Sequence, residues 1–294
     1  MLERWGSLSV SDHVDTNAVI ANVLLYDRLI VPVMTAQPDR DEFEYWNGRG
    51  WQPDLQRKRL DQLGHLAVKR PWDRHRRAAF QTRYAQLAAE RADADAMALQ
   101  LTRRILANEP VERPAGVQGV EVVAAYSSLS ALPSDFDVQE ATDHAGAQAL
   151  LLTRQLRVPA EKDPEDSLRV AIELSRDPDF RGRRSDLFDW QNTARIRQLQ
   201  PKDAVDYLVE LVGHYNKKVE EASAKVGTRF AFTIAGGLLG FATGGPIGAA
   251  AGATLSLLQF VTLDREPAIE QGSLAPVAMF HDIEVKLGYR LGAA

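Results

Sequence analysis

The chain has 294 residues, of which 45% are hydrophobic and 26% charged, and its formal net charge is -5. This composition is typical of a folded globular protein, and the mild acidity does not favour nucleic acid as a partner. Cysteine is absent, which excludes disulfides, thiolate-bound zinc, iron–sulfur clusters and a cysteine nucleophile. The first residues lack the pattern of a secretory signal, so we expect a cytoplasmic protein.

The first fifty residues predict a small mixed region. Residues 7–10 suggest a short strand, residues 18–26 have helical apolar spacing, and residues 29–33 form a β-like apolar run stopped by Pro32. Asn47-Gly48 is a turn signal between aromatic residues, which predicts a hairpin within residues 43–51. A loop anchored by two tryptophans is the alternative.

Helical patterns follow. We predict one amphipathic helix over residues 53–68 and a second over residues 71–108, which is rich in good helix formers and is ended by Pro110. Residues 120–126 are the best strand prediction in the middle of the chain. This basic helical segment and the flanking strands make up a proposed first region, residues 1–130.

Residues 131–294 form the proposed second region, whose sequence predicts helices. Asp163-Pro164 and Asp177-Pro178 each combine an N-cap with a proline at the first helical position, so helices should follow both. Pro201 starts another helix, whose apolar residues have heptad spacing and predict lengthwise packing against a helix of the same chain. An amphipathic helix over residues 276–290 closes the chain. The heptad positions are Leu208, Val212, Tyr215, Val219, Ala222 and Val226.

An uncharged, glycine-rich segment covers residues 230–263. Its glycines recur at every fourth position, which on a helix lines up one stripe free of side chains and lets another helix approach closely. Gly244-Gly245-Pro246 interrupts the run, so the chain should turn there. We therefore predict a packed helical hairpin within residues 228–263. Its packing stripe consists of Gly236, Gly240, Gly244, Gly248 and Gly252.

The same segment suggests two locations, one inside the protein and one in a membrane. Arms of this size span roughly 21–26 Å at about 1.5 Å per residue, whereas a hydrocarbon core is about 30 Å thick. We therefore favour a hairpin buried among the amphipathic helices. The alternative is a stored hairpin that enters a membrane through residues 230–263, as in helical pore-forming proteins, because thinning and tilting can compensate for the shortfall.

Asp12, His13 and Asp15 are the densest group of potential metal ligands. Two carboxylates and an imidazole suit a hard or borderline cation. Neighbouring residues seldom point into one site unless the backbone turns, so we favour the interpretation that Asp15 or Thr16 caps a helix. A metal-dependent hydrolase or nuclease is the alternative, and we expect no cofactor.

Other catalytic patterns are weak. His281 and Glu284 have the i,i+3 spacing of a surface helix pair, and Asp143-His144 lacks further histidines at suitable positions. Ser127-Ser128 follows a predicted strand, but the Gly-x-Ser-x-Gly elbow of serine hydrolases is absent. No glycine loop precedes a lysine in the manner of a phosphate-binding loop.

The segment from residue 54 to residue 104 has an excess of Lys and Arg over Asp and Glu. Such a patch could contact phosphates or anionic lipid headgroups. We favour a solvated helix face, or a face that pairs with the acidic residues between Asp39 and Glu44. The candidate anion-binding residues are Lys69, Arg70, Arg74, Arg76 and Arg77.

Together these patterns predict a mainly α fold, with a small N-terminal α+β portion and helices around the glycine-rich hairpin. The leading functional hypothesis is a non-enzymatic protein, a regulator or effector of bacterial type, that acts by binding another protein. In this interpretation the partner controls exposure of the hairpin.

Overall fold

The computed structural model describes residues 2–90, 92, 94–125, 156–157, 163–193, 198–199, 203–204, 206–213, 274–288 and 290–291. Several sequence predictions lie outside these residues. They are the hairpin of residues 228–263, its glycine stripe and turn, the proposed boundary after residue 130, Ser127-Ser128 and Asp143-His144.

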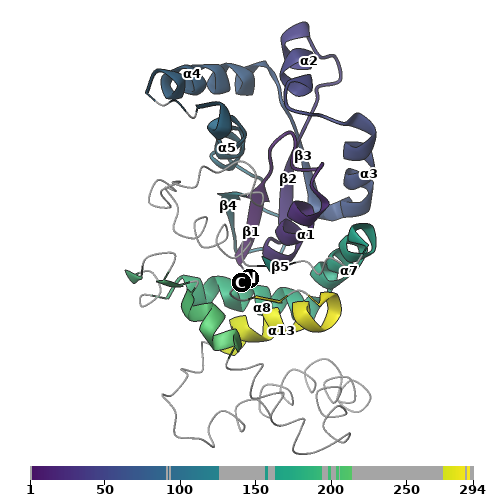
Figure 1. Cartoon of the computed structure of the whole chain (residues 1–294), viewed down its shortest axis with the longest axis vertical. Coiled ribbons are helices and arrows are strands. Elements are labelled where there is room, and N and C mark those ends of the chain that lie inside the picture. Colours follow the sequence, from purple (N-terminus) through teal and green to yellow (C-terminus); the bar gives the residue numbers. More distant parts are fainter. Residues whose placement is uncertain are drawn as a thin grey trace, which may run out of the picture.

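A four-stranded parallel sheet lies at the centre of the protein (Figure 1). Its strands are β1 (Leu2–Ser7), β2 (Arg28–Val33), β3 (Ala67–Pro71) and β4 (Gly119–Ala124). The order is β3-β2-β1-β4, and all three neighbouring pairs are parallel. The chain runs outward from β1 to β3 and then crosses back to place β4 on the other side of β1. This is a Rossmann-like α/β fold, so the predicted mainly α fold is wrong.

Two strands account for much of this error. The sequence of β1, Leu-Glu-Arg-Trp-Gly-Ser, is not an apolar run, because it carries Glu3 and Arg4. Both side chains are nevertheless buried and paired: Arg4 Nε donates to Glu121 at 2.8 Å, and Glu3 accepts from Trp5 Nε1 at 2.9 Å. Glu121 is far away in the sequence, so only the tertiary structure supplies this partner of Arg4. The strand starts five residues before the predicted one at residue 7.

The predicted helix over residues 53–68 ends early. Helix α3 spans Pro53–Leu63 and stops at Gly64, whose φ of 56° lies in the left-handed region that favours glycine. A short 3-10 turn, η1 (Gly64–Leu66), then leads into β3. Lys69 is exposed on β3, which is the edge strand beside β2. A charged edge strand has no continuous apolar pattern, so the sequence predicts a helix as far as residue 68 and no strand at residues 67–71.

Pro32 lies inside β2 and does not end it. The Ile30 carbonyl oxygen accepts the Leu8 N–H at 2.9 Å, so the backbone of Ile30 faces β1. The backbone of Pro32, two residues further along β2, faces the same side. The ladder between β1 and β2 has already ended there, at Ile30. The hydrogen-bond ladder with β1 therefore loses no bond at Pro32, which has no N–H. The Pro32 carbonyl accepts a hydrogen bond from Gln56 Nε2 at 3.0 Å.

The hairpin predicted around Asn47-Gly48 is a helix. Helix α2 spans Arg40–Asn47, and the Asp39 side chain caps it by accepting the Glu42 N–H at 2.7 Å. Gly48 ends it. The alternative prediction is supported in part, because Trp46 and Trp51 contact each other with ring centroids 5.6 Å apart across the loop that follows.

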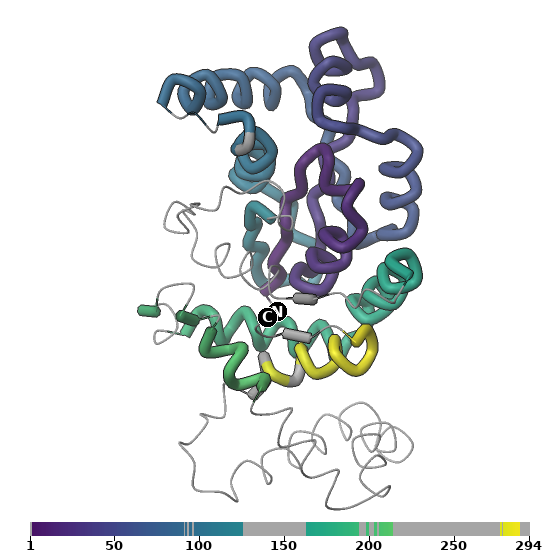
Figure 2. Tube along the Cα trace, viewed as in Figure 1, coloured from purple at the N-terminus to yellow at the C-terminus, as the bar shows by residue number. Residues whose placement is uncertain are grey.

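The single helix predicted over residues 71–108 is two helices, α4 (Arg74–Glu90) and α5 (Ala94–Ala107). They pack against each other, and α5 also lies along β4 and β1 (Figures 1 and 2). The break lets the apolar face around Phe80 meet the face around Leu101, which no straight helix could do. Both residues belong to one buried cluster with Trp72.

Several local predictions are confirmed. Helix α1 (Thr16–Leu25) and strands β2 and β4 lie within two residues of their predicted positions. Helices α7 (Pro164–Arg176) and α8 (Pro178–Gln191) begin at the two predicted caps, Asp163 and Asp177. The predicted last helix is α13 (Leu274–Leu287). Short strands β5 (Leu156–Arg157) and β6 (Arg290–Leu291) pair antiparallel.

Helices α8 and α13 lie side by side across the end of the sheet at which the strands begin, while α7 packs against α1 (Figures 1 and 2). One hydrophobic core continues from α1 and β2 into these later helices. Leu208 and Val212, from the predicted heptad seam, are buried in this core. None of the helices in the described part of the chain is long and apolar enough to cross a membrane.

A buried ion pair joins the sheet to these helices. Arg184 of α8 is fully buried and donates to Asp27 Oδ1 from Nε at 3.0 Å and from Nη2 at 2.7 Å. Its Nη1 donates to Ser175 Oγ of α7 at 3.0 Å and to the Val23 carbonyl of α1 at 3.2 Å. One guanidinium therefore holds three helices and the turn before β2.

We predict that Arg184→Met lowers the free energy of unfolding by about 3–5 kcal/mol, because Asp27 is left as a buried, uncompensated charge. Arg169→Met is the matched control: its pair with Glu173 is exposed and contributes less than about 1 kcal/mol. Urea denaturation at pH 7 measures both. Equal losses in the two variants would contradict the central role of Arg184.

Candidate functional site

The loop after β1, residues 8–15, lies where the strand order reverses. In open parallel sheets, ligands bind outside the carboxyl ends of the strands at this switch point, here between β1 and β4. The loop contains Asp12, His13 and Asp15, so the fold brings this predicted group to the expected position. The loop has no glycine, and therefore lacks the tight phosphate-binding turn of dinucleotide-binding proteins.

Asp12 is almost fully buried and forms an ion pair with Arg103 of α5. Arg103 donates from Nε to Asp12 Oδ2 at 2.9 Å and from Nη2 to Oδ1, and the Ser9 N–H also donates to Oδ2. Burial alone raises the pKa of Asp12, but the charge and hydrogen bonds of Arg103, with those of Ser9, hold the pKa below its usual value. Both carboxylate oxygens are thus engaged within the protein.

His13 is also buried and contacts the loop between α2 and α3. Its Nε2 accepts the Gln52 N–H at 3.3 Å. Burial lowers the pKa of His13, and this effect outweighs the opposing interactions with the Val10 and Gln52 backbone and with Asp12. The imidazole is therefore neutral near pH 7 and serves as a hydrogen-bond acceptor.

Asp15 turns away to the start of α1. Its Oδ1 accepts the N–H groups of Asn17 at 3.0 Å and Ala18 at 3.2 Å, which is the N-cap that the sequence predicts. The three candidate ligands thus have three separate partners. No group of His, Asp and Glu side chains suited to a metal ion is found in the described part of the chain.

A second buried ionic group lies between α2 and α4. Glu42 is 1% exposed and accepts from Arg77 Nη1 at 2.9 Å and from the Thr35 hydroxyl at 2.6 Å. Arg77 also binds Asp39. Pairing of the basic segment with the acidic residues from Asp39 to Glu44 was one of the sequence interpretations, and these contacts confirm it for Arg77.

The candidate anion-binding set is only partly exposed. Arg70 and Arg76 both bind Glu109, at 2.6 and 2.7 Å, and so face an acid of the same chain. Lys69 and Arg74 are exposed. The five residues therefore do not form one open basic surface, because Arg70, Arg76 and Arg77 act in internal ion pairs.

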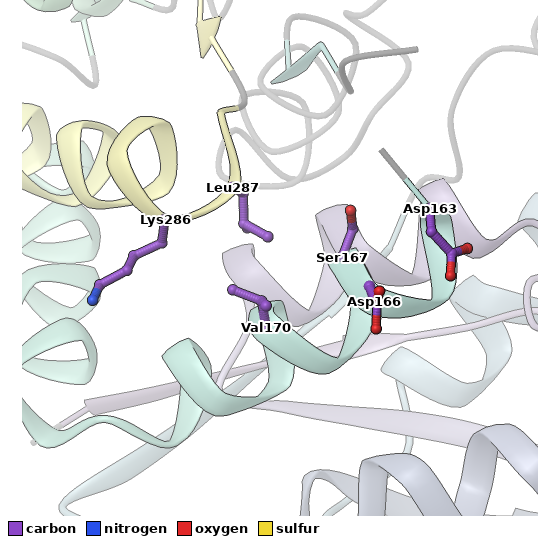
Figure 3. Close-up of a pocket in the computed structure, with 6 residues that line it drawn as sticks. All are labelled: Asp163, Asp166, Ser167, Val170, Lys286 and Leu287. Carbon is purple, nitrogen blue, oxygen red and sulfur yellow. The ribbon is translucent and has the colours of Figure 1, made fainter. Parts of the chain in front are cut away.

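His281 and Glu284 lie on α13, where burial lowers the pKa of His281 more than Glu284 raises it. A separate pocket of about 260 Å³ lies between the start of α7 and the end of α13 (Figure 3). This volume is below the range of typical small-molecule sites, about 300–1,000 Å³. Its lining residues are Asp163, Asp166, Ser167, Val170, Lys286 and Leu287.

Sequence patterns did not identify Arg103 and Gln52, the residues that bind Asp12 and His13 at the carboxyl ends of the strands. Arg103 sits two residues after Leu101 and two before Ile105, on a helix whose apolar residues indicate burial. An arginine beside such a face signals a buried ion pair, since an isolated buried charge is costly. Nothing local to Gln52 indicates its role, because only its backbone N–H takes part.

No protein-family model, no curated protein and no solved structure matches this chain. Fold class alone does not assign an activity, so the functional argument has to come from the site itself.

We predict that Asp12→Asn destabilises the protein by about 3–5 kcal/mol at pH 7, because Arg103 loses its buried counterion. Asp15→Asn is the matched control and should change the stability by only a few tenths of a kcal/mol, since Asn caps helices about as well as Asp.

The double variant Asp12→Asn, Arg103→Met tests the pairing itself. Its loss should be smaller than the sum of the two single losses, as expected for residues in direct contact. Urea unfolding curves provide the comparison, and strictly additive losses would contradict the ion pair.

Proposed function

We propose that this protein acts by binding another protein and not by catalysis. The proposal rests on the contacts made by the polar side chains at the carboxyl ends of the strands. Asp12 and Glu42 are buried there against arginines, and His13 Nε2 accepts a backbone N–H. A general base or nucleophile needs a position from which it can reach a substrate. These side chains instead hold α3, α4 and α5 in place.

The sequence supplies the proposed contact surface. Residues 230–263 contain no charged side chain, while the described helices around the sheet carry charge at many exposed positions. Large uncharged apolar surfaces in proteins mark interaction sites when they are not buried. We propose that the partner binds this segment and that the complex is cytoplasmic. The proposal needs no cofactor.

A membrane-disrupting effector is the second candidate, and the same uncharged segment is the observation that favours it. The metal-dependent hydrolase is not proposed, because the oxygens of Asp12 are engaged by Arg103 and Ser9, and Asp15 caps α1.

We predict that a photo-cross-linking phenylalanine analogue at Phe241 captures one specific protein partner when the full chain is expressed in its own cells. The same analogue at Phe43, which is 49% exposed on α2, is the control and should not capture that partner. Mass spectrometry of the adducts identifies what is bound.

Gly240→Leu should abolish the Phe241 adduct, because a bulky side chain on the glycine stripe prevents close packing. Thr254→Leu adds a similar volume away from the stripe and should leave the adduct intact. Adducts to lipid, together with leakage of liposomes, would favour the membrane effector. A chain that gives no adduct and causes no leakage would contradict both candidates.

A further inference from the structure

The contact between His13 and Gln52 joins two loops that are far apart in the sequence. His13 precedes α1, whereas Gln52 is the N-cap residue of α3. Gln52 has no side-chain cap of its own, so the imidazole meets its backbone at the start of that helix. His13 is 4% exposed, whereas Gln52 is exposed, so the contact is part-buried.

This bond depends on the protonation state of the imidazole. As an acceptor, Nε2 carries no proton, and the neutral ring has its proton on Nδ1. A second proton would place an N–H at Nε2 directly against the Gln52 N–H. Two donors cannot share the bond, so protonation must break it.

We propose that His13 is a pH-sensitive latch, whose protonation releases the loop of residues 48–52 from the loop that follows β1. The proposal does not rest on the proposed function.

Burial and the positive charge of Arg59 favour release, because they lower the pKa of His13 more than the Val10 and Gln52 backbone and Asp12 raise it. Asp12 is adjacent, but Arg103 neutralises its carboxylate. Arg59 of α3 acts on His13 as a positive charge and is itself paired with Glu165. No unpaired carboxylate among these neighbours compensates an imidazolium in the closed state.

The released segment is defined by its remaining contacts. Trp51 packs against Trp46, and its Nε1 donates to Gln56 Oε1 at 3.0 Å. Gln56 in turn holds the Pro32 carbonyl of β2. The contacts of Trp51 lie on α2 and α3, so the loop can part from the β1 loop while α3 stays on the sheet.

The pH range follows from the direction of the pKa shift. The folded-state pKa of His13 is below its ordinary value, so the open state binds a proton more readily than the closed state. The latch is fully effective above the ordinary His pKa of about 6.5 and weakens as the pH falls through and below that value. Each pH unit in that range favours opening by about tenfold until His13 titrates in the closed form.

The test is the hydrogen-exchange protection of the Gln52 amide in the full chain, measured by NMR between pH 7.5 and 5. The wild-type protection factor should fall by up to about tenfold per pH unit below pH 6.5 or so. His13→Gln keeps an acceptor oxygen without a titration and should remove most of this dependence. His13→Ala lacks the acceptor and should leave Gln52 poorly protected at every pH.

His75→Gln is the control, because His75 is exposed on α4. It should reproduce the wild-type profile. A wild-type Gln52 protection factor that does not change with pH would overturn the latch. So would an unchanged pH dependence in His13→Gln, which would assign the effect to another group.

Discussion

The burial of Arg184 against Asp27 is the constraint on which the arrangement of the protein depends. Asp27 stands between α1 and β2, and its Oδ2 also accepts the Arg4 N–H of β1 at 2.9 Å. Removing two charges from water is costly, and only close geometry with further hydrogen bonds compensates that cost. Arg184 meets this condition only when α1, α7 and α8 are all in place. The pair therefore specifies one docking of the later helices on the sheet.

The same principle governs the opposite end of the sheet. In Rossmann-like proteins the carboxyl edge holds a ligand, often a phosphate at a helix N-terminus. Here the start of α1 is capped by Asp15, and the charges of Asp12 and Glu42 are neutralised by Arg103 and Arg77. Internal ion pairs thus engage these two carboxylates at the carboxyl edge of the sheet. The architecture alone therefore does not assign an activity.

The buried His13 differs from these ion pairs because the charge of an imidazole changes near physiological pH. The ion pair of Asp12 with Arg103 joins the loop to α5. Although burial raises the pKa of Asp12, this pairing holds it below its usual value, and so below the physiological pH range. His13 has an ordinary pKa within reach of that range, so its contact with Gln52 is the part of the edge that is most sensitive to conditions. The loop after β1 therefore contains an ion pair, at Asp12, next to a pH-sensitive contact, at His13.

The sequence by itself determined the local elements whose signals are local. The caps Asp15, Asp163 and Asp177 and the apolar runs of α1, β2 and β4 predicted elements that the structure confirms, because capping and periodicity depend only on neighbouring residues. It also placed Asp12, His13 and Asp15 in one loop, without their partners.

The tertiary structure decided the fold class and the role of that loop. Strand β1 is stable with Glu3 and Arg4 buried because Trp5 and Glu121 lie in reach, and Glu121 is far away in the sequence. Strand β3 has a charged edge sequence and exists because β2 supplies its hydrogen bonds. Asp12 is a structural anion because α5 brings Arg103 to it. For Arg4 and Asp12 the deciding energy is a long-range pairing of buried polar groups, and for β3 it is the backbone pairing with β2. The paired residues are far apart in the sequence in all three cases.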